Sequence, residues 1–223
     1  MTIPEADYQT VRDLNVNEHQ THLQYRYWED EFANNKYLKG HFEVVKGSLG
    51  QSVTRSNIVD FYRKPDVPDE TKFLAAMIWG HEAPAGSRRD SRGPWKVTKM
   101  FAYPLASEAA IRNVSIANRS DITSSYKELD KVLDRCGPNF FTKHFYFLGK
   151  SKGLQAYPLI FDDRVAGGLM KVSLASACCS GMVRVTAARK AEAYLQYLDY
   201  AVGQAQLIGC DLDQIEYFFF RQR

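Results

Sequence analysis

Residues 122–171 read ITSSYKELDKVLDRCGPNFFTKHFYFLGKSKGLQAYPLIFDDRVAGGLMK, and their pattern is the most informative in the chain. Apolar side chains recur at helical spacing in its first part, until Gly137 and Pro138 interrupt the pattern with a tight turn. Helical character resumes over residues 140–148, and the extended segment AYPLIF follows before Asp162 opens a third helix. The pattern therefore predicts two helices joined by a short turn, then an extended segment and a further helix start.

The remainder of the chain also favours helices, because apolar periodicity, caps and Gly or Pro stops recur along it. No run of strand-forming residues is long enough for a sheet-based fold. We therefore expect a mostly α protein, one domain of two helical lobes around a shared cleft. Helices are expected over residues 19–34, over 56–63 with Ser56 as the cap, from Asp69 to the stop at Gly80, over 95–101, 107–114 and 187–209, and from about Asp211 onward. Residues 37–54, which contain Gly40, Gly47 and Gly50, are expected to be irregular or short strand.

Composition excludes several classes of protein. The chain has 223 residues, 45% of them hydrophobic and 25% charged, as in a globular domain. The first residues lack the pattern of a signal peptide, and no apolar stretch approaches the ~20 residues that span a bilayer, so we expect a cytoplasmic protein. The four cysteines form no CxxC pair, so neither a metal nor another cofactor is expected. A net charge of only +3 leaves any affinity for nucleic acid to local clusters.

Lys143 and Asp162 are the candidate catalytic pair. Lys143 lies near the start of the helix that follows the turn, and Asp162 lies at the next helix start, 19 residues later. Alone, such a lysine is usually a solvated surface residue and such an aspartate an N-cap. Their order, gap and context together indicate a shared site.

This block resembles the helix-hairpin-helix DNA glycosylase superfamily, in particular its 8-oxoguanine DNA glycosylase-like, compact prokaryotic branch. The matching residues are Thr142 and Lys143 after the turn, and Pro158 to Asp162 in PLIFD; the resemblance covers roughly residues 70–220. It implies a helix-hairpin-helix glycosylase-like domain over 69–223, with the hairpin at about 122–148. Residues 1–68 are then expected to be a helical or irregular segment that packs on this core.

The resemblance also implies the chemistry. Lys143 would be the amine nucleophile that attacks the sugar carbon and forms a Schiff base, for which burial helps by favouring the neutral amine. Asp162 would stabilise the positive charge that develops on the sugar, as carboxylates do at other glycosidic bonds. Asp163 is adjacent and remains an alternative. Phe141 stands where the family has the second glycine of its hairpin. Glycine there lets the backbone approach a phosphate closely, so its absence counts against the family's usual phosphate contact at this turn.

Several further residues are candidates for contact with DNA. In the turn, backbone N–H groups around Gly137, Asn139 and Thr142 would favour a phosphate. The densest basic run begins in the loop after the predicted helix 69–80 and continues into the predicted helix 95–101; the alternative interpretation is a solvated loop. Its candidate phosphate contacts are Arg88, Arg89, Arg92 and Lys96.

Three residues are candidates for the pocket of a base flipped out of the duplex, namely Trp79, Trp95 and His144. For each of them a packing role is the simpler interpretation. The resemblance implies a monomeric, nucleoid-associated DNA glycosylase and AP lyase. It would excise an oxidised or otherwise modified base from double-stranded DNA, in base-excision repair or antiviral defence. The alternatives are a catalytically inactive helix-hairpin-helix DNA-binding module and a protein-interaction scaffold.

Overall fold

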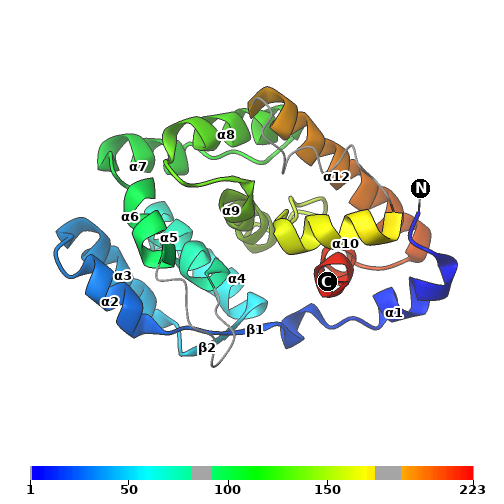
Figure 1. The fold of residues 1–223 in the computed structure, drawn as a ribbon, viewed down its shortest axis with the longest axis horizontal. Coiled ribbons are helices and arrows are strands. Elements are labelled where there is room, and N and C mark those ends of the chain that lie inside the picture. The colour runs from blue at the N-terminus through cyan, green and yellow to red at the C-terminus, as the bar shows by residue number, and fades with distance from the viewer. Residues whose placement is uncertain (1, 82–91, 174–186, 223) are drawn as a thin grey trace.

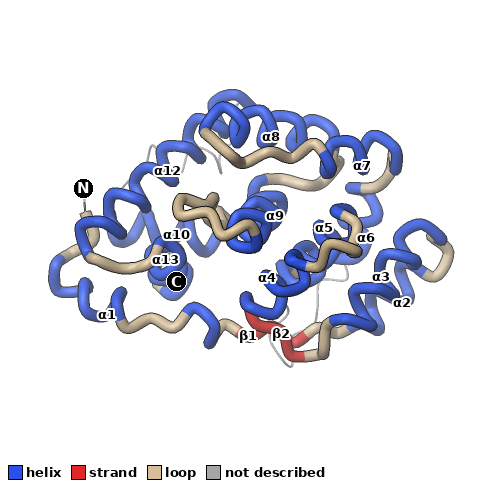
Figure 2. The backbone as a smooth tube through the Cα atoms, turned by 180° about the vertical axis from the view of Figure 1, so that it is seen from behind, coloured by secondary structure: helices blue, strands red, loops and turns tan. Residues whose placement is uncertain are grey.

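The structure is a computed structural model that describes residues 2–81, 92–173 and 187–222. These residues form a mostly helical fold, as the sequence predicted, together with one small two-stranded sheet (Figures 1 and 2). None of the helices in the described ranges has both the length and the apolar character needed to cross a membrane.

The N-terminal part of the chain differs most from expectation. It begins with the 3-10 helix Glu5–Asp7, α1 (Tyr8–Arg12) and the 3-10 helix Val16–Glu18. The helix expected over 19–34 is wrong in its first third, because β1 (Gln20–His22) precedes α2 (Tyr25–Phe32). β1 pairs antiparallel with β2 (Ser52–Thr54), with Thr21 opposite Val53. This pairing joins segments about thirty residues apart, so local periodicity does not reveal it.

The expectation of irregular or short strand structure over 37–54 is wrong for most of that segment, which is α3 (Lys36–Ser48), and right at its end, where β2 is a short strand. Leu38, Phe42 and Val45 recur at helical spacing on one face of α3 and are buried. Their burial outweighs the cost of glycine in a helix, about 1 kcal/mol relative to alanine. A Cβ added at Gly40 would meet no atom within 4 Å, so this glycine is not required by packing.

α4 (Arg55–Arg63) begins one residue before the predicted cap. Thr54, and not Ser56, is the N-cap residue, and its side chain accepts the Asn57 backbone N–H. The Asn57 side chain in turn accepts the Thr54 backbone N–H at 2.9 Å. This reciprocal pair satisfies two backbone donors at the helix start and fixes the boundary between β2 and α4.

The later helices agree with the predicted ones to within a few residues at their ends. The segment AYPLIF is non-helical, as expected, and Asp162 directly precedes a helix. The elements are α5 (Asp69–Gly80), α6 (Arg92–Met100), α7 (Pro104–Arg112), α8 (Arg119–Val132), α9 (Pro138–Ser151), α10 (Asp163–Ser173), α12 (Ala187–Ile208) and α13 (Leu212–Arg221).

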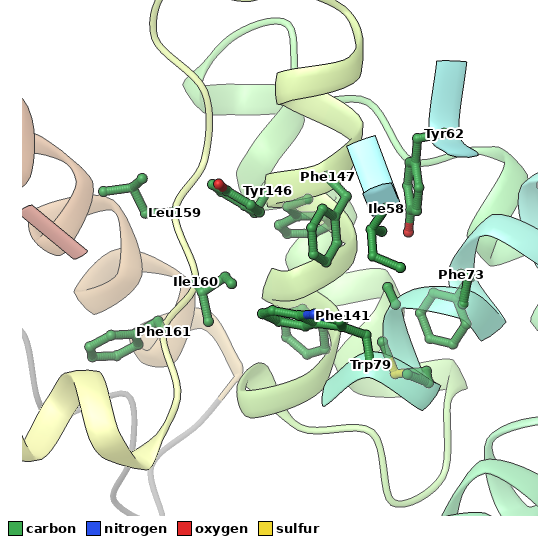
Figure 3. Packing of buried hydrophobic residues seen from close by; sticks show 14 of the residues in the cluster. Ile58, Tyr62, Phe73, Trp79, Phe141, Tyr146, Phe147, Leu159, Ile160 and Phe161 are labelled. Carbon is green, nitrogen blue, oxygen red and sulfur yellow. The ribbon is translucent and has the colours of Figure 1, made fainter. Parts of the chain in front are cut away.

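α9 occupies the middle of the molecule, where it packs against α4, α5 and α8 (Figure 1). Phe141 and Phe147 of α9 lie between Ile58 of α4 and the segment before α10, which carries Ile160 (Figure 3). The buried side chains form one continuous hydrophobic cluster that includes the N-terminal third of the chain. The division at residue 69 stays a prediction.

α10 and α13 make the closest helix pair in this part of the core. A Cβ at Gly168 would lie 1.9 Å from the Phe219 carbonyl oxygen, so only glycine allows this approach. Tyr217, Phe218 and Phe219 of α13 are buried. The close backbone contact therefore packs α10, whose N-cap residue is Asp162, directly against α13.

Candidate functional site

Lys143 and Asp162 are in direct contact, as the sequence predicted. The Lys143 Nζ lies 3.1 Å from the Asp162 Oδ2, and it also donates to the Asn139 carbonyl one helical turn earlier, at 2.5 Å. The Lys143 side chain is only 6% exposed and that of Asp162 17% exposed. An ion pair so largely withdrawn from water is expensive to form unless its geometry is good, and it interacts far more strongly than a surface pair.

Asp162 is held as the N-cap of α10. Its Oδ1 accepts the backbone N–H groups of Arg164 and Val165, each at 3.1 Å, which leaves Oδ2 for Lys143. The neighbouring Asp163 is exposed and is the first residue of α10. Of the two adjacent carboxylates, therefore, Asp162 is the one that contacts the amine. The cap makes it a rigid partner, because both of its oxygens are bonded.

The protonation state of Asp162 follows from these contacts. Burial by itself raises the pKa of this carboxyl, but the Lys143 ammonium and the Val165 and Arg164 amides outweigh it and hold the pKa below its ordinary value. Asp162 is therefore a carboxylate at neutral pH. It can balance positive charge or accept a proton, but it does not carry one to donate.

Thr142 fastens α9 to the segment before Asp162. Its hydroxyl donates to the Pro138 carbonyl at 2.5 Å and accepts the Phe161 backbone N–H at 3.1 Å. Thr142 is completely buried, so its side chain supports the Lys143–Asp162 pair from inside the protein and does not face solvent. This is the structural reason for a short polar residue next to the lysine.

Gly80, predicted only as a helix stop, forms one wall of the site. A Cβ at this position would lie 2.6 Å from Cδ and 2.9 Å from Cε of Lys143, closer than real contacts allow. α5 and α9 therefore approach each other over a glycine, and the Lys143 chain passes through the gap. The sequence carries no signal for this role, because it depends on the packing of two helices 60 residues apart.

The turn before α9 is built differently from a phosphate-binding glycine loop. Gly137 is the N-cap residue with a φ of −84°, and a Cβ there would meet no atom within 4 Å. Its carbonyl accepts the backbone N–H groups of Phe140 and Phe141. Phe141 is fully buried, edge-on to Tyr126 at 4.7 Å. Phe141, which stands where the resemblance expects a glycine, thus packs in the core. Asn139 contacts Lys143 through its backbone carbonyl.

His144 and Trp79 lie inside the protein. His144 is buried beside Tyr62, whose hydroxyl is 2.8 Å from its Nδ1, and burial lowers the pKa of the imidazole to about 3. It is therefore neutral at physiological pH. Trp79 is buried edge-on to Phe147 at 5.2 Å. The packing interpretation thus describes the position of both residues, and neither of them lines an open surface.

Two of the remaining predicted residues, Trp95 and Lys96, lie on α6. Trp95 is exposed, and the Lys96 Nζ lies 5.7 Å from the ring centre of Phe140 at the start of α9. Arg88 and Arg89 fall outside the described residues. Arg92 is the first residue of α6, but its side chain is likewise outside them. Within the described ranges, no group of three or more His, Cys, Asp or Glu residues is placed to hold a metal ion.

A second buried ion pair, which the sequence analysis missed, ties the N-terminal third to the C-terminal helix. Arg55 of α4 donates to both carboxylate oxygens of Glu216 on α13, and the two side chains are 2% and 0% exposed. The guanidinium also lies over the rings of Trp79, Tyr146 and Tyr217. Partners separated by 161 residues leave no local pattern, so only the tertiary structure reveals them.

Comparison with known proteins supports the resemblance. A protein-family model described as "Putative 8-oxoguanine DNA glycosylase OGG-like protein" matches residues 14–220. This match includes the Lys143–Asp162 pair, both partners of the Arg55–Glu216 pair and most of the N-terminal third. No curated protein and no solved structure shows a significant match to the chain.

Proposed function

The chain belongs to the OGG-like 8-oxoguanine DNA glycosylase family, and from that premise we propose that it excises a modified base from DNA and cleaves the resulting abasic site through Lys143. The observation that carries this proposal is the buried contact between the Lys143 amine and the capped Asp162 carboxylate, 3.1 Å apart. Oxidised purines such as 8-oxoguanine are the substrate class that the family description favours.

The proposed reaction assigns separate tasks to the two groups. The Lys143 ammonium first gives up a proton, which leaves on the departing base, with Asp162 as the acceptor that can relay it. The neutral amine then bonds to the sugar carbon as the bond between sugar and base breaks. Asp162 stabilises the positive charge that the sugar carries at that moment. As the sugar ring opens, a proton moves from the adduct nitrogen to the ring oxygen and leaves a Schiff base. A base, for which the Asp162 carboxylate is the candidate, then takes a proton from the neighbouring carbon, and the electron pair of that bond expels the 3′ phosphate.

Two features of the site favour this assignment over a purely structural ion pair. Both carboxylate oxygens of Asp162 are engaged by backbone and amine donors, so the group is fixed before any substrate arrives. Preorganised charge of this kind is the largest single contribution in many enzymes. In addition, Gly80 and Asn139 confine the Lys143 chain along its length. A nucleophile held in place needs little reorganisation to react.

Borohydride trapping on a duplex with one abasic site tests the proposal without knowledge of the base. Borohydride reduces a Schiff base to a stable amine, so the wild-type protein should become covalently attached to the DNA. Lys143→Gln should abolish the adduct. Lys150→Gln is the matched control, because Lys150 also lies on α9 and pairs with an aspartate, Asp213, at 2.8 Å. It should trap as the wild type does.

A panel of duplexes, each with one modified base and including 8-oxoguanine, then identifies the substrate. A wild-type protein that neither traps on abasic DNA nor releases any base would contradict the enzymatic proposal. Such a protein would have to be an inactive member of the family. Trapping that persists in Lys143→Gln would show that another amine, and not Lys143, is the nucleophile.

A further inference from the structure

A surface groove lies between α6 and the link that joins α8 to α9. Its volume is about 510 Å³, and it is open to solvent along its length. Basic and aromatic side chains line it together with the N-cap residue of α9; they are Lys99, Tyr103, Lys131, Arg135 and Gly137. We call these residues the α6–α8 groove.

Trp95 stands at the edge of the α6–α8 groove, 38% exposed. The Lys99 Nζ lies 5.8 Å and the Arg135 guanidinium carbon 5.7 Å from the centre of its ring. Trp95 is the only one of the chain's three tryptophans among the exposed large hydrophobic residues; Trp28 and Trp79 are both buried in the core. An exposed indole flanked by two cations is a suitable surface for a flat ring that carries negative charge nearby, as a nucleotide does.

The charge of the groove is positive once its internal pairs are counted. Its two carboxylates are Asp130, which pairs with Lys190 at 3.5 Å, and Asp134, which lies 3.8 Å from the Arg135 guanidinium. Lys99 and Lys131 are exposed, and no carboxylate among the described residues is recorded within ion-pair distance of either of them. The groove thus holds three cations, Lys99, Lys131 and Arg135, against one carboxylate, Asp134, that Lys190 does not already balance. The contact between Asp134 and Arg135 is exposed and therefore weak, so Arg135 is available to a phosphate.

One end of the groove lies at the start of α9, the helix that carries Lys143. Gly137 lies in the groove and begins α9, and the carbonyl of Asn139 in the first turn of that helix accepts from Lys143. The Lys96 ammonium, next to Trp95 in the chain, lies over the ring of Phe140 in the same turn. A strand of nucleic acid in the groove would thus reach the start of α9, where Lys143 is anchored.

From this placement we propose that the α6–α8 groove binds the DNA strand beside the target nucleotide, with Lys99 and Arg135 on phosphates and Trp95 stacked on an unpaired base. The inference rests on the proposed function, because it takes DNA as the substrate. It deepens that function by assigning a strand-binding surface that includes Lys99, Lys131 and Arg135.

Arg135 offers a variant that separates binding from folding. Its φ of 59° is in the left-handed region, and it is the single non-glycine residue with positive φ in the described ranges. Glycine adopts this conformation without cost, so Arg135→Gly removes the cation while keeping or improving the backbone. A residue with only a structural role would therefore lose nothing on this substitution.

The experiment measures the affinity of the protein for a duplex that contains a tetrahydrofuran analogue of an abasic site, which cannot be cleaved. The titration is repeated between about 50 and 200 mM salt, where each phosphate contact contributes about 0.9 to the slope of log affinity against log salt. Arg135→Gly should weaken binding and reduce that slope by about 0.9. Trp95→Ala should weaken binding about tenfold with the slope unchanged, because stacking releases no counterion.

Arg63→Ala is the matched control, since Arg63 is similarly exposed (57% against 61% for Arg135) but lies on α4. It should leave affinity and slope at wild-type values, and the thermal midpoint of Arg135→Gly should equal or exceed that of the wild type. Wild-type affinity in Trp95→Ala, or a wild-type slope in Arg135→Gly, would overturn the proposal. The α6–α8 groove would then have to bind a partner other than DNA. Borohydride trapping by Lys143 is scored separately, so loss of chemistry and loss of the groove are distinguishable.

Discussion

Gly80→Ala is the substitution that most directly tests how Lys143 is positioned. The added methyl carbon would lie 2.6 Å from Cδ of Lys143, and ordinary contact begins at 3.4 Å, so about 0.8 Å of movement is required. Lys143 cannot yield freely, because its backbone belongs to α9 and its amine is bonded to Asp162 and the Asn139 carbonyl. The movement must therefore come from the amine or from the α5–α9 spacing.

The magnitude follows from that displacement. A misplacement of about 1 Å in a catalytic group can cost about 10²-fold in rate, so we expect the single-turnover trapping rate on abasic DNA to fall by roughly that factor. Overpacking costs about 1–3 kcal/mol, and replacing glycine in a helix returns up to about 1 kcal/mol. The free energy of unfolding should therefore fall by no more than about 3 kcal/mol, as measured by urea titration.

Gly40→Ala is the control for the general effect of adding a methyl group to a helix. Gly40 is exposed in the interior of α3, with no atom within 4 Å of the added carbon. It should gain about 0.5–1 kcal/mol and trap at the wild-type rate. If the Gly80→Ala and Gly40→Ala proteins had the same trapping rate on abasic DNA, the contact between Gly80 and the Lys143 side chain would not position the amine.

Three further predictions follow from the two buried ion pairs. Asp162→Asn should keep the cap of α10, because asparagine also caps, but should lower base excision by several orders of magnitude in a single-turnover assay; wild-type excision would remove the carboxylate from the reaction. The stability that the Asp162 carboxylate adds should be complete above its unfolded pKa of about 3.9 and lost as pH falls through its lower folded pKa. The difference in unfolding free energy between wild type and Asp162→Asn should therefore shrink below about pH 4. A difference that stays constant with pH would disprove this linkage. Glu216→Gln should leave the Arg55 guanidinium buried without its counter-charge and cost about 3–5 kcal/mol in urea unfolding, and a loss below about 1 kcal/mol would mean that water reaches the pair.

The errors at the N-terminus show where local signals fail. Gly40, Gly47 and Gly50 indicated irregular structure, yet the buried face of α3 outweighs the cost of the two that lie in it. The 19–34 segment has the periodicity of a helix, yet its first residues join a strand that begins at Ser52. In both places the deciding free energy comes from contacts with residues outside the window that a periodicity argument examines.

For the candidate site, the sequence was sufficient to name two residues that lie in contact, Lys143 and Asp162, but not their surroundings. Turn residues, helix starts and the resemblance selected Lys143 and Asp162, and the structure confirms their contact. The supporting contacts were not predicted: Gly80 against the lysine chain and the Thr142 hydroxyl on the Phe161 amide. They join separate helices and loops, so no spacing along the chain encodes them.

The sequence by itself determined the helical class, the turn at Gly137 and the capping position of Asp162, because periodicity, chain breakers and caps act within a few residues. The tertiary structure alone decided that Trp79 is buried and Trp95 exposed, and that Arg55 meets Glu216 across the core. Burial and ion pairing depend on which surfaces meet when helices pack, and that outcome is a property of the whole chain.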